Sequence, residues 1–510
     1  MSGAHEQFLG GDFEGCLGSC DTIVVRDDAM HFELALLRAR VLLRLDRADR
    51  AVEALLACAF TPISTDGLVT AEMLLGTAYL RLGQHERGEE LLSQAEARSS
   101  DAHPTIRAEL TLHRGIAKYL TSRHDEADAL LASVPPEADM IRARALEYRG
   151  WIEFTRGRFD IAALRFRAAF DCIGLCRWRD RFVEANVLLG LCTLSAEMMD
   201  TAAWEPVELR VRAFDWNAAG LGRPRFWVAM YCSMMSELLG DDERARAWSR
   251  QAELDAPNIA YRAIALCQTA SVFRGLRESR AHLEFALRAR IIYEAMDPSA
   301  LGPDQKQLPL FIAEELAYGR APEDAARLLK QYREVIAPML RAVAGDERYA
   351  ALEELIDGSL ADARGDRNAA VRSYTHALSK FRKLGYRRRA AAVALRLARM
   401  TGSNRYRLYA ASTLTGADPR FWMAQELRSG GADRAPMLTD RQRIVLTLVA
   451  EGKTYKEIGV TLGRSWKTIS NTVEQLRAKF GTGTRGELVA VAMRRGTIGG
   501  PNDPEASRSA

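Results

Sequence analysis

The sequence predicts an all-α protein, in which a long array of paired helices is followed by a small four-helix domain. Three observations lead to this fold class. Apolar residues recur at helical spacing, and strand-like runs are nearly absent. Small residues repeat at steps of about 35 to 45 residues through most of the chain. Four helix-capping signals then follow one another closely near the C-terminus.

The charge distribution sets the C-terminal part apart from the rest of the chain. The 510 residues carry a formal net charge of +4. Between Leu438 and Gly496 there are eleven Lys and Arg against five Asp and Glu, so the remainder is close to neutral. A small basic domain on a near-neutral body predicts a local site for a polyanion.

The eight cysteines form no C-x-x-C pair, although Cys16/Cys20 and Cys172/Cys176 have i, i+4 spacing. That spacing leaves a metal or redox site open, but small buried residues in a reducing compartment are the more usual role. The N-terminus lacks a secretory-signal pattern, and no apolar run is long enough for a membrane span. We therefore expect a cytoplasmic protein.

The repeat unit begins with a small residue, has a second small residue about 12 positions later, and a large apolar one about 16 positions after the start. The first small residue lets the two helices of a hairpin approach closely, and neighbouring hairpins must stack to bury their apolar faces. Units start at Gly76, Gly115, Gly150, Ala313 and Gly358, with weaker copies at Ala39, Gly190, Ser233, Ala270 and Ala394. Gly83, Gly157 and Gly365 are predicted to end the first helix of their units in the left-handed conformation.

This pattern resembles the tetratricopeptide repeat over roughly residues 30 to 400, and its longer period is similar to the repeats of MalT-type bacterial regulators. The resemblance implies an α-solenoid whose concave groove senses a peptide, a protein or a small ligand. A candidate lining is a stripe of aromatic and Met side chains at helical spacing: Phe226, Trp227, Met230, Tyr231 and Met234. An ordinary core between repeats has the same spacing, so that alternative stays open.

The predicted boundaries place the array at residues 1–428, a linker at 429–437, the small four-helix domain at 438–498 and a disordered tail at 499–510. The linker combines Gly, charged residues and Pro. In the last domain Thr439, Thr454 and Thr484 each precede a Gln or Glu by three residues, as in a capping box, and Ser465 can cap the remaining helix. With Gly452, Gly463 and Gly481 at helix ends, we expect helices over about 439–450, 454–462, 465–480 and 484–495.

The second and third of these helices are joined by Gly463-Arg464, which predicts a helix-turn-helix whose second helix enters the major groove. One side of that helix is apolar and is predicted to face the core: Ile469, Val473, Leu476 and Phe480. The opposite side carries Lys467, Asn471 and Glu474, with Ser470 at its edge.

The pieces LTDRQRIVL, VAEGKTYKEIG, LGRSWKTISNTV and LRAKFGTGTRGELVAVAM resemble the LuxR/FixJ/GerE helix-turn-helix domain over Leu438 to Ile498. The resemblance implies a transcriptional regulator that binds double-stranded DNA as a homodimer. The resemblance implies that Ser470, Asn471 and Glu474 read DNA bases. It also implies contacts with the DNA backbone for four residues: Thr454, Lys456, Lys467 and Thr468. Phosphate anchoring is also predicted for Lys453, Lys479 and Arg485.

Several positions depart from the family pattern. Ser470 and Glu474 stand where basic residues are frequent, Gln442 where Glu is common, and Thr472 where His is common. A carboxylate near the groove repels phosphate, yet it can accept a hydrogen bond from cytosine N4, while Asn471 suits adenine. The departures therefore indicate an atypical base preference, or alternatively a protein-interaction scaffold whose terminal domain no longer binds DNA.

Enzyme motifs are missing from the sequence. There is no G-x-x-x-x-G-K-[ST], no G-x-S-x-G and no H-E-x-x-H, and the eight His have no metal-ligand spacing. GTGTRG at 481–486 matches a dinucleotide-binding fingerprint only literally, because it follows a helix rather than a strand. We expect no enzyme activity, no catalytic residue, no cofactor and no metal site.

Overall fold

The structure is a computed structural model that describes residues 2–58, 64–176, 178–302, 305–319, 321–338, 347–429, 438–480 and 482–494. Within these residues every regular element is a helix, as predicted. Contacts divide the chain into two compact units, Met1–Trp422 and Met423–Ala510. The boundaries predicted for the linker and the tail stay predictions, because residues 430–437 and 495–510 lie outside the described ranges.

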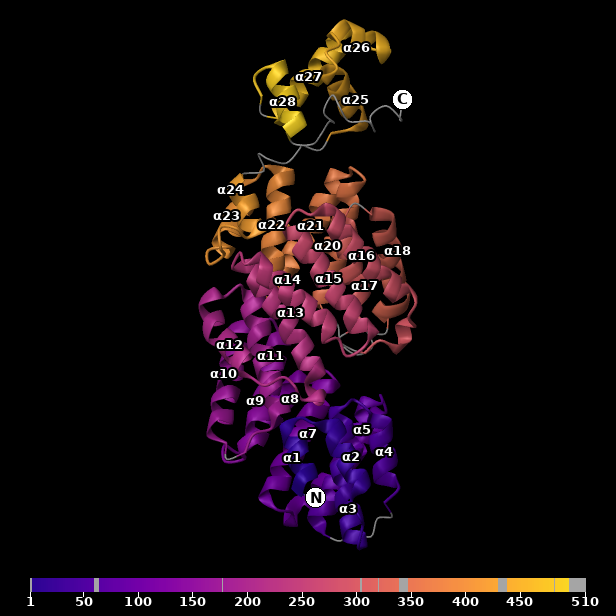
Figure 1. Ribbon diagram of the computed structural model, residues 1–510, viewed down its shortest axis with the longest axis vertical. Coiled ribbons are helices and arrows are strands. Elements are labelled where there is room, and N and C mark those ends of the chain that lie inside the picture. The colour runs from indigo at the N-terminus through magenta and orange to yellow at the C-terminus, as the bar shows by residue number, and fades with distance from the viewer. Residues whose placement is uncertain are drawn as a thin grey trace. The chain divides into compact units, whose positions relative to one another are not determined.

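The first unit is a tetratricopeptide-like solenoid of helix hairpins (Figure 1). Its helices before residue 200 are α1 (Ser2–Gly10), α2 (Phe13–Thr22), α3 (Asp28–Arg44), α4 (Ala48–Leu56), α5 (Thr65–Arg81), α6 (His85–Arg98), α7 (Pro104–Leu120), α8 (His124–Ala132), α9 (Asp139–Thr155), α10 (Phe159–Leu175) and α11 (Arg181–Met198). Those after it are α12 (Thr201–Ala213), α13 (Gly222–Leu238), α14 (Asp242–Leu254), α15 (Ile259–Gly275), α16 (Ser279–Glu294), α17 (Leu308–Tyr318), α18 (Pro322–Gln331), α20 (Glu347–Ala363), α21 (Arg367–Lys383), α22 (Arg387–Thr401) and α23 (Asn404–Thr413).

Short 3-10 helices lie at η1 (Ser99–Asp101), η2 (Ala219–Leu221) and η3 (Pro298–Ala300), and a π-helical turn, η4 (Tyr332–Ile336), follows α18. The second unit holds α24 (Trp422–Ser429), which begins at the unit boundary, and then α25 (Asp440–Ala450), α26 (Tyr455–Thr461), α27 (Trp466–Phe480) and α28 (Arg485–Arg494). The last four agree with the predicted ranges to within about one residue at each end.

The predicted small residues lie where the two helices of each hairpin meet. All ten predicted unit starts are buried in the first helix of a hairpin. A Cβ added to Gly150 in α9 would lie 2.8 Å from the ring of Phe166 in α10, so the glycine permits the close approach. Gly83, Gly157 and Gly365 have φ of +78°, +72° and +79°, which confirms the predicted left-handed helix ends.

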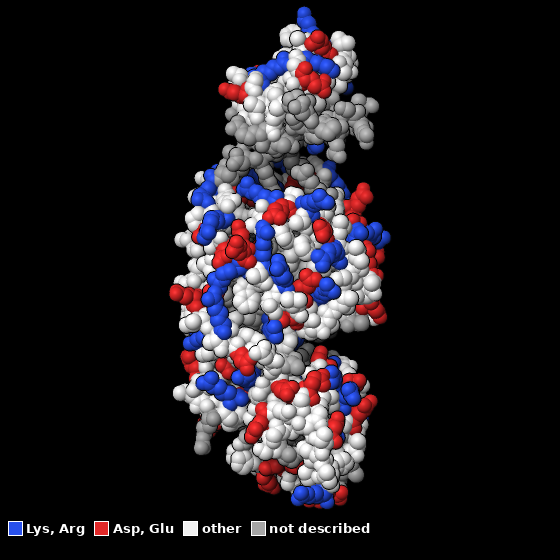
Figure 2. All heavy atoms as spheres, viewed as in Figure 1, with Lys and Arg blue, Asp and Glu red and all other residues white. Residues whose placement is uncertain are grey.

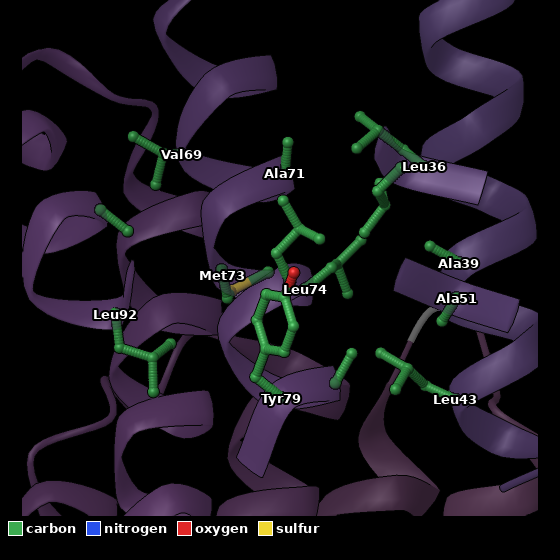
Figure 3. Close-up of a cluster of buried hydrophobic side chains, with 14 of the residues drawn as sticks. Leu36, Ala39, Leu43, Ala51, Val69, Ala71, Met73, Leu74, Tyr79 and Leu92 are labelled. Atoms are coloured by element: carbon green, nitrogen blue, oxygen red, sulfur yellow. The ribbon is translucent and has the colours of Figure 1, made fainter. Parts of the chain in front are cut away.

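Buried leucine, alanine and aromatic side chains fill the space between successive hairpins. In the core formed by α3 to α7, Leu36, Leu43 and Leu74 are at most 6% exposed (Figure 3). Six of the eight cysteines are buried and all eight are free thiols, which agrees with a packing role. Among the described residues no group of three or more His, Cys, Asp or Glu is placed to hold a metal ion. No described helix combines the length and the apolar character that crossing a bilayer requires.

One feature of the solenoid was not predicted, because the repeat pattern starts at α3. An additional hairpin, α1–α2, precedes it and packs against later helices. The backbone N–H of Gly220 donates to the carbonyl of Gly11 at 3.1 Å, and the rings of Phe13 and Phe182 lie 5.7 Å apart. Arg44 of α3 also pairs with Asp180, 136 positions later, at 2.8 Å. The first half of the solenoid therefore closes into a ring of helices from α1 to α11.

Candidate DNA-binding surface

The starts of the helices α25 to α28 are fixed by side-chain caps. Thr439 forms a capping box with Gln442, and Thr454 forms one with Glu457. At α28 the backbone N–H of Glu487 donates to Thr484 Oγ1 at 3.2 Å, and the N–H of Thr484 donates to Glu487 Oε2 at 3.1 Å. The N–H of Thr468 donates to Ser465 Oγ at 3.2 Å. All four predicted caps are confirmed, and they place the helices locally.

The apolar side of α27 packs into the centre of the unit. The four residues predicted to face the core are at most 3% exposed: Ile469, Val473, Leu476 and Phe480. They contact apolar residues of the other three helices, including Val445, Ile458 and Leu488. Burying this side fixes the rotation of α27 about its axis, so its polar side faces outward.

The turn between α26 and α27 depends on two glycines. Gly463 has φ of +61°, which ends α26 as predicted. Gly459 was not predicted: an added Cβ would lie 2.6 Å from the carbonyl oxygen of Arg464, so only glycine allows α26 and the turn to approach this closely. The N–H of Arg464 donates to the Gly459 carbonyl at 2.8 Å. A lone glycine inside a predicted helix is the signal that marks such a position.

The outward side of α27 is polar and accessible. Lys467, Asn471 and Glu474 are exposed, and Ser470 is half-buried at the edge, as the sequence predicted. The result is a helix-turn-helix that presents one polar helix face, which is the geometry that enters a major groove. On the face drawn in Figure 2 the solenoid mixes Lys and Arg with Asp and Glu, so that face offers no single-sign surface to a polyanion.

Comparison with known proteins identifies this helical unit. The model of the family described as "Bacterial regulatory proteins, luxR family" matches residues 436–492. The spore germination protein GerE of Bacillus subtilis (strain 168) is 36% identical over 63 residues, which is 12% of this chain and 85% of GerE. The chain belongs to the luxR family of bacterial regulatory proteins.

The solenoid is similar to solved helical structures at low sequence identity. A crystal structure of a Rap protein complexed with competence and sporulation factor is 14% identical with a TM-score of 0.48, covering 72% of this chain and 99% of that one. The apo form of RapI is 10% identical with a TM-score of 0.40, covering 78% of this chain and 97% of RapI.

In this luxR-family domain Glu474 is not an isolated negative charge. Arg477 Nη1 donates to Glu474 Oε1 at 2.6 Å, and the carboxylate-bearing side chain is 65% exposed. Arg477 also donates to the Gly483 carbonyl. This partner was not predicted, although the i, i+3 spacing on one helix is the signal for it. The pairing reduces the repulsion that Glu474 exerts on a phosphate backbone.

The residues with predicted backbone contacts differ in their surroundings. Lys456 and Lys467 are exposed and form no ion pair with any residue that the structure describes. Lys453 lies 3.3 Å from a carboxylate oxygen of Glu451, and Lys479 Nζ donates to Gln442 Oε1 at 2.7 Å. The Gln at position 442 thus links α25 to α27.

The two threonines and Arg485 also serve the fold. The backbone N–H of Thr454 donates to Glu457 Oε2 at 2.6 Å, and the hydroxyl of Thr454 donates to the same oxygen at 2.8 Å. Together these two hydrogen bonds lower the pKa of Glu457. The hydroxyl of Thr468 lies 2.9 Å from that of Ser465. Arg485 Nη2 donates to the carbonyls of Val449 and Lys453 at 3.1 and 2.7 Å, at the C-terminal end of α25. Their DNA contacts stay predictions.

The aromatic and Met stripe of α13 divides into two groups. Phe226 and Met230 are 0% and 6% exposed and pack between hairpins, which agrees with the core alternative. Trp227, Tyr231 and Met234 are half-buried, and the rings of Trp227 and Tyr231 lie 6.3 Å apart. A ligand-facing role stays a prediction for these three residues.

Proposed function

We propose that the protein is a transcriptional regulator that inserts α27 into the major groove of double-stranded DNA. The observation that carries this proposal is the division of α27 into a fully buried apolar side and an exposed polar side. Membership of the luxR family supports it. Asn471 would pair with adenine, Glu474 would accept a hydrogen bond from cytosine N4, and Ser470 would bond to either. Lys456 and Lys467, both exposed, would hold phosphates on either side of the turn.

The protein would engage DNA as a homodimer on two half-sites, with the solenoid as the sensor of a peptide, protein or small-molecule effector. A ligand that binds one arrangement of the solenoid better than another would change how well two helix-turn-helix domains engage half-sites together. The competing function, a scaffold without DNA binding, drew its support from Ser470 and Glu474, and the Arg477 pair bears on the second of these residues. The Arg477 pair weakens that support because the carboxylate is partly neutralised.

The test is the salt dependence of DNA binding by the full-length chain, measured by fluorescence anisotropy on a random-sequence duplex. Five predicted phosphate-contacting cations contribute about −4 to −5 per copy to the slope of log K against log salt, and so about −9 for the homodimer, at about −0.9 for each contact. Lys467→Ala should weaken binding to every sequence and reduce the magnitude of the slope by about 1 for each bound copy.

Lys330→Ala is the matched control, because Lys330 is 74% exposed on the solenoid and pairs with Glu334 at 3.8 Å. It should leave both affinity and slope unchanged. Absence of binding in dilute salt, or binding without a salt dependence, would favour the scaffold. If Lys467→Ala and Lys330→Ala lost DNA affinity equally, the assignment of α27 as the DNA-binding surface would be contradicted.

A further inference from the structure

The ring of helices from α1 to α11 borders a partly open cavity of about 830 Å³. Its lining comes from α1, α3, α5, α7 and α9 and from the segment that leads into α11. A volume of this size is typical of sites for small organic ligands, which are concave, mostly apolar and carry a few well-placed polar groups. It is too small for a folded partner domain.

Leucine and isoleucine side chains line one part of the cavity. Leu36 and Leu43 of α3 and Leu74 of α5 border it from the core shown in Figure 3, and Leu112 and Ile116 of α7 extend the same surface. These side chains are buried in the fold and still border the cavity. They offer an apolar surface for the body of a ligand.

Charged side chains from different helices line the rest. Arg40 binds both carboxylate oxygens of Glu109, with one of these bonds at 2.9 Å, so this pair is satisfied within the protein. The hydroxyl of Thr77 and Nδ1 of His113 lie 2.8 Å apart, which occupies that imidazole nitrogen. Burial, Arg144 and Arg40 together lower the pKa of His113 to about 3, so this imidazole is neutral.

Arg44 is the group whose bonding is incomplete. Its side chain is 9% exposed, and its Nη2 donates to Asp180 Oδ2 at 2.8 Å. The guanidinium lies 4.4 Å from the centre of the Phe182 ring. Its Nη1 is buried and has no hydrogen-bond partner in the described structure. An unpaired donor on a buried cation costs free energy unless a ligand completes its bonds.

Asp180 is shared between Arg44 and the start of α11. Its Oδ1 already accepts from the backbone N–H groups of Phe182 and Val183 at 2.9 and 3.2 Å, as the cap of α11. Arg144 also lines the cavity. Burial and the repulsion of Arg144 lower the pKa of Arg44 to about 10.

We propose that this cavity binds a small amphipathic organic carboxylate. Its carboxylate accepts hydrogen bonds from the guanidinium groups of Arg44 and Arg144, and its apolar body lies against the leucine and isoleucine wall. Two sources supply this chemistry: a free aliphatic acid, or the C-terminal carboxylate of a short apolar peptide. Binding of the carboxylate does not depend on the proposed function. An effect of the ligand on DNA binding rests on the proposed function.

The position of Arg44 gives the ligand a means to act on the solenoid. Arg44 in α3 and Asp180 at the start of α11 connect the two ends of the ring of helices. A carboxylate that joins this pair adds bonds at the point of closure. The bound form therefore favours the closed ring over any more open arrangement.

The experiment is isothermal titration of the full-length protein with two acids and their uncharged amides: octanoate against octanamide, and acetyl-Leu-Leu-Leu against acetyl-Leu-Leu-Leu-amide. We expect at least one acid to bind about tenfold more tightly than its amide, because hydrogen bonds to charged groups are the strong ones. The acid that exceeds the affinity of its own amide by the larger factor identifies the source. If neither acid is preferred over its amide, the proposal is overturned.

Variants locate the preference. Arg44→Gln should remove the preference for the acid and leave amide binding, and Arg144→Gln should reduce the preference about as much. Arg38→Gln is the matched control, because Arg38 lies on the same helix, pairs with Asp21 at 2.7 Å and does not line the cavity. It should keep the full preference.

Circular dichroism melting shows whether each variant is folded. If Arg44→Gln does not fold, Arg144→Gln still tests whether the preference for the acid depends on this end of the cavity. A preference that survives in a folded cavity variant overturns the proposal. DNA binding in the absence of any ligand is measured separately. Failure of acid binding and failure of DNA binding are therefore distinguishable.

Discussion

Replacing Glu147 by Gln should remove a pH dependence of the free energy of unfolding. Glu147 lies in α9, is 6% exposed, and its Oε1 accepts a hydrogen bond from Trp151 Nε1 at 3.3 Å. Burial raises its pKa to about 7, against the attraction of Arg144 and Arg44, which lowers it; Asp180 adds to the rise. The carboxylate is therefore accommodated poorly when it is charged.

The sign of the effect follows from proton binding. Between its ordinary pKa of 4.5 and about 7, the folded Glu147 keeps a proton that the unfolded chain has lost. Stability therefore falls as the pH rises through this range. A tenfold difference in proton affinity corresponds to about 1.36 kcal/mol, so the full effect is about 3 kcal/mol. About 2 kcal/mol of it lies between about pH 5.5 and about pH 8.

The assay is urea denaturation followed by circular dichroism at both pH values. Relative to the wild type, the free energy of unfolding of Glu147→Gln should rise by about 2 kcal/mol between about pH 5.5 and about pH 8, because the amide has no charge to bury. Glu126→Gln is the control, since Glu126 is 57% exposed, and it should follow the wild type. An equal pH dependence in the wild type and Glu147→Gln would refute the reasoning.

Three further substitutions test the packing of the two units. Gly190→Ala should lower stability by about 1–3 kcal/mol, because the added Cβ would lie 2.4 Å from the buried ring of Phe166; Gly174→Ala, with open space around the new methyl, should raise it by up to about 1 kcal/mol. Melting temperatures that fall equally for both variants would contradict the close approach of α11 to Phe166. Arg485→Gln should speed amide hydrogen exchange at the end of α25, because it removes the donor to Val449 and Lys453; unchanged exchange would show that these bonds do not stabilise the helix end.

The features that the sequence predicted well are those set by neighbouring residues. The capping boxes at Thr439, Thr454 and Thr484 place the helix starts because the bonded atoms are three residues apart. The repeat starts are equally local, since a small residue such as Gly150 and the side chain it accommodates belong to one hairpin.

The features that were not predicted depend on distant parts of the chain. The closed ring and its cavity rest on Arg44 and Asp180, which are 136 positions apart and carry no mutual signal in a single sequence. For the same reason periodicity did not separate Phe226 and Met230, which are core residues, from their half-buried neighbours. The Glu474–Arg477 pair was within reach, because its spacing on one helix is visible in the sequence.

The most direct test of the central claim, that the exposed side of α27 reads bases, is repeated selection of random duplexes by the full-length protein followed by sequencing. The wild type should enrich a motif of two related half-sites. Asn471→Ala should change the preferred base at one position of each half-site, and Lys467→Ala should enrich the same motif more weakly. No enriched motif, or one that Asn471→Ala leaves unaltered, would contradict the account.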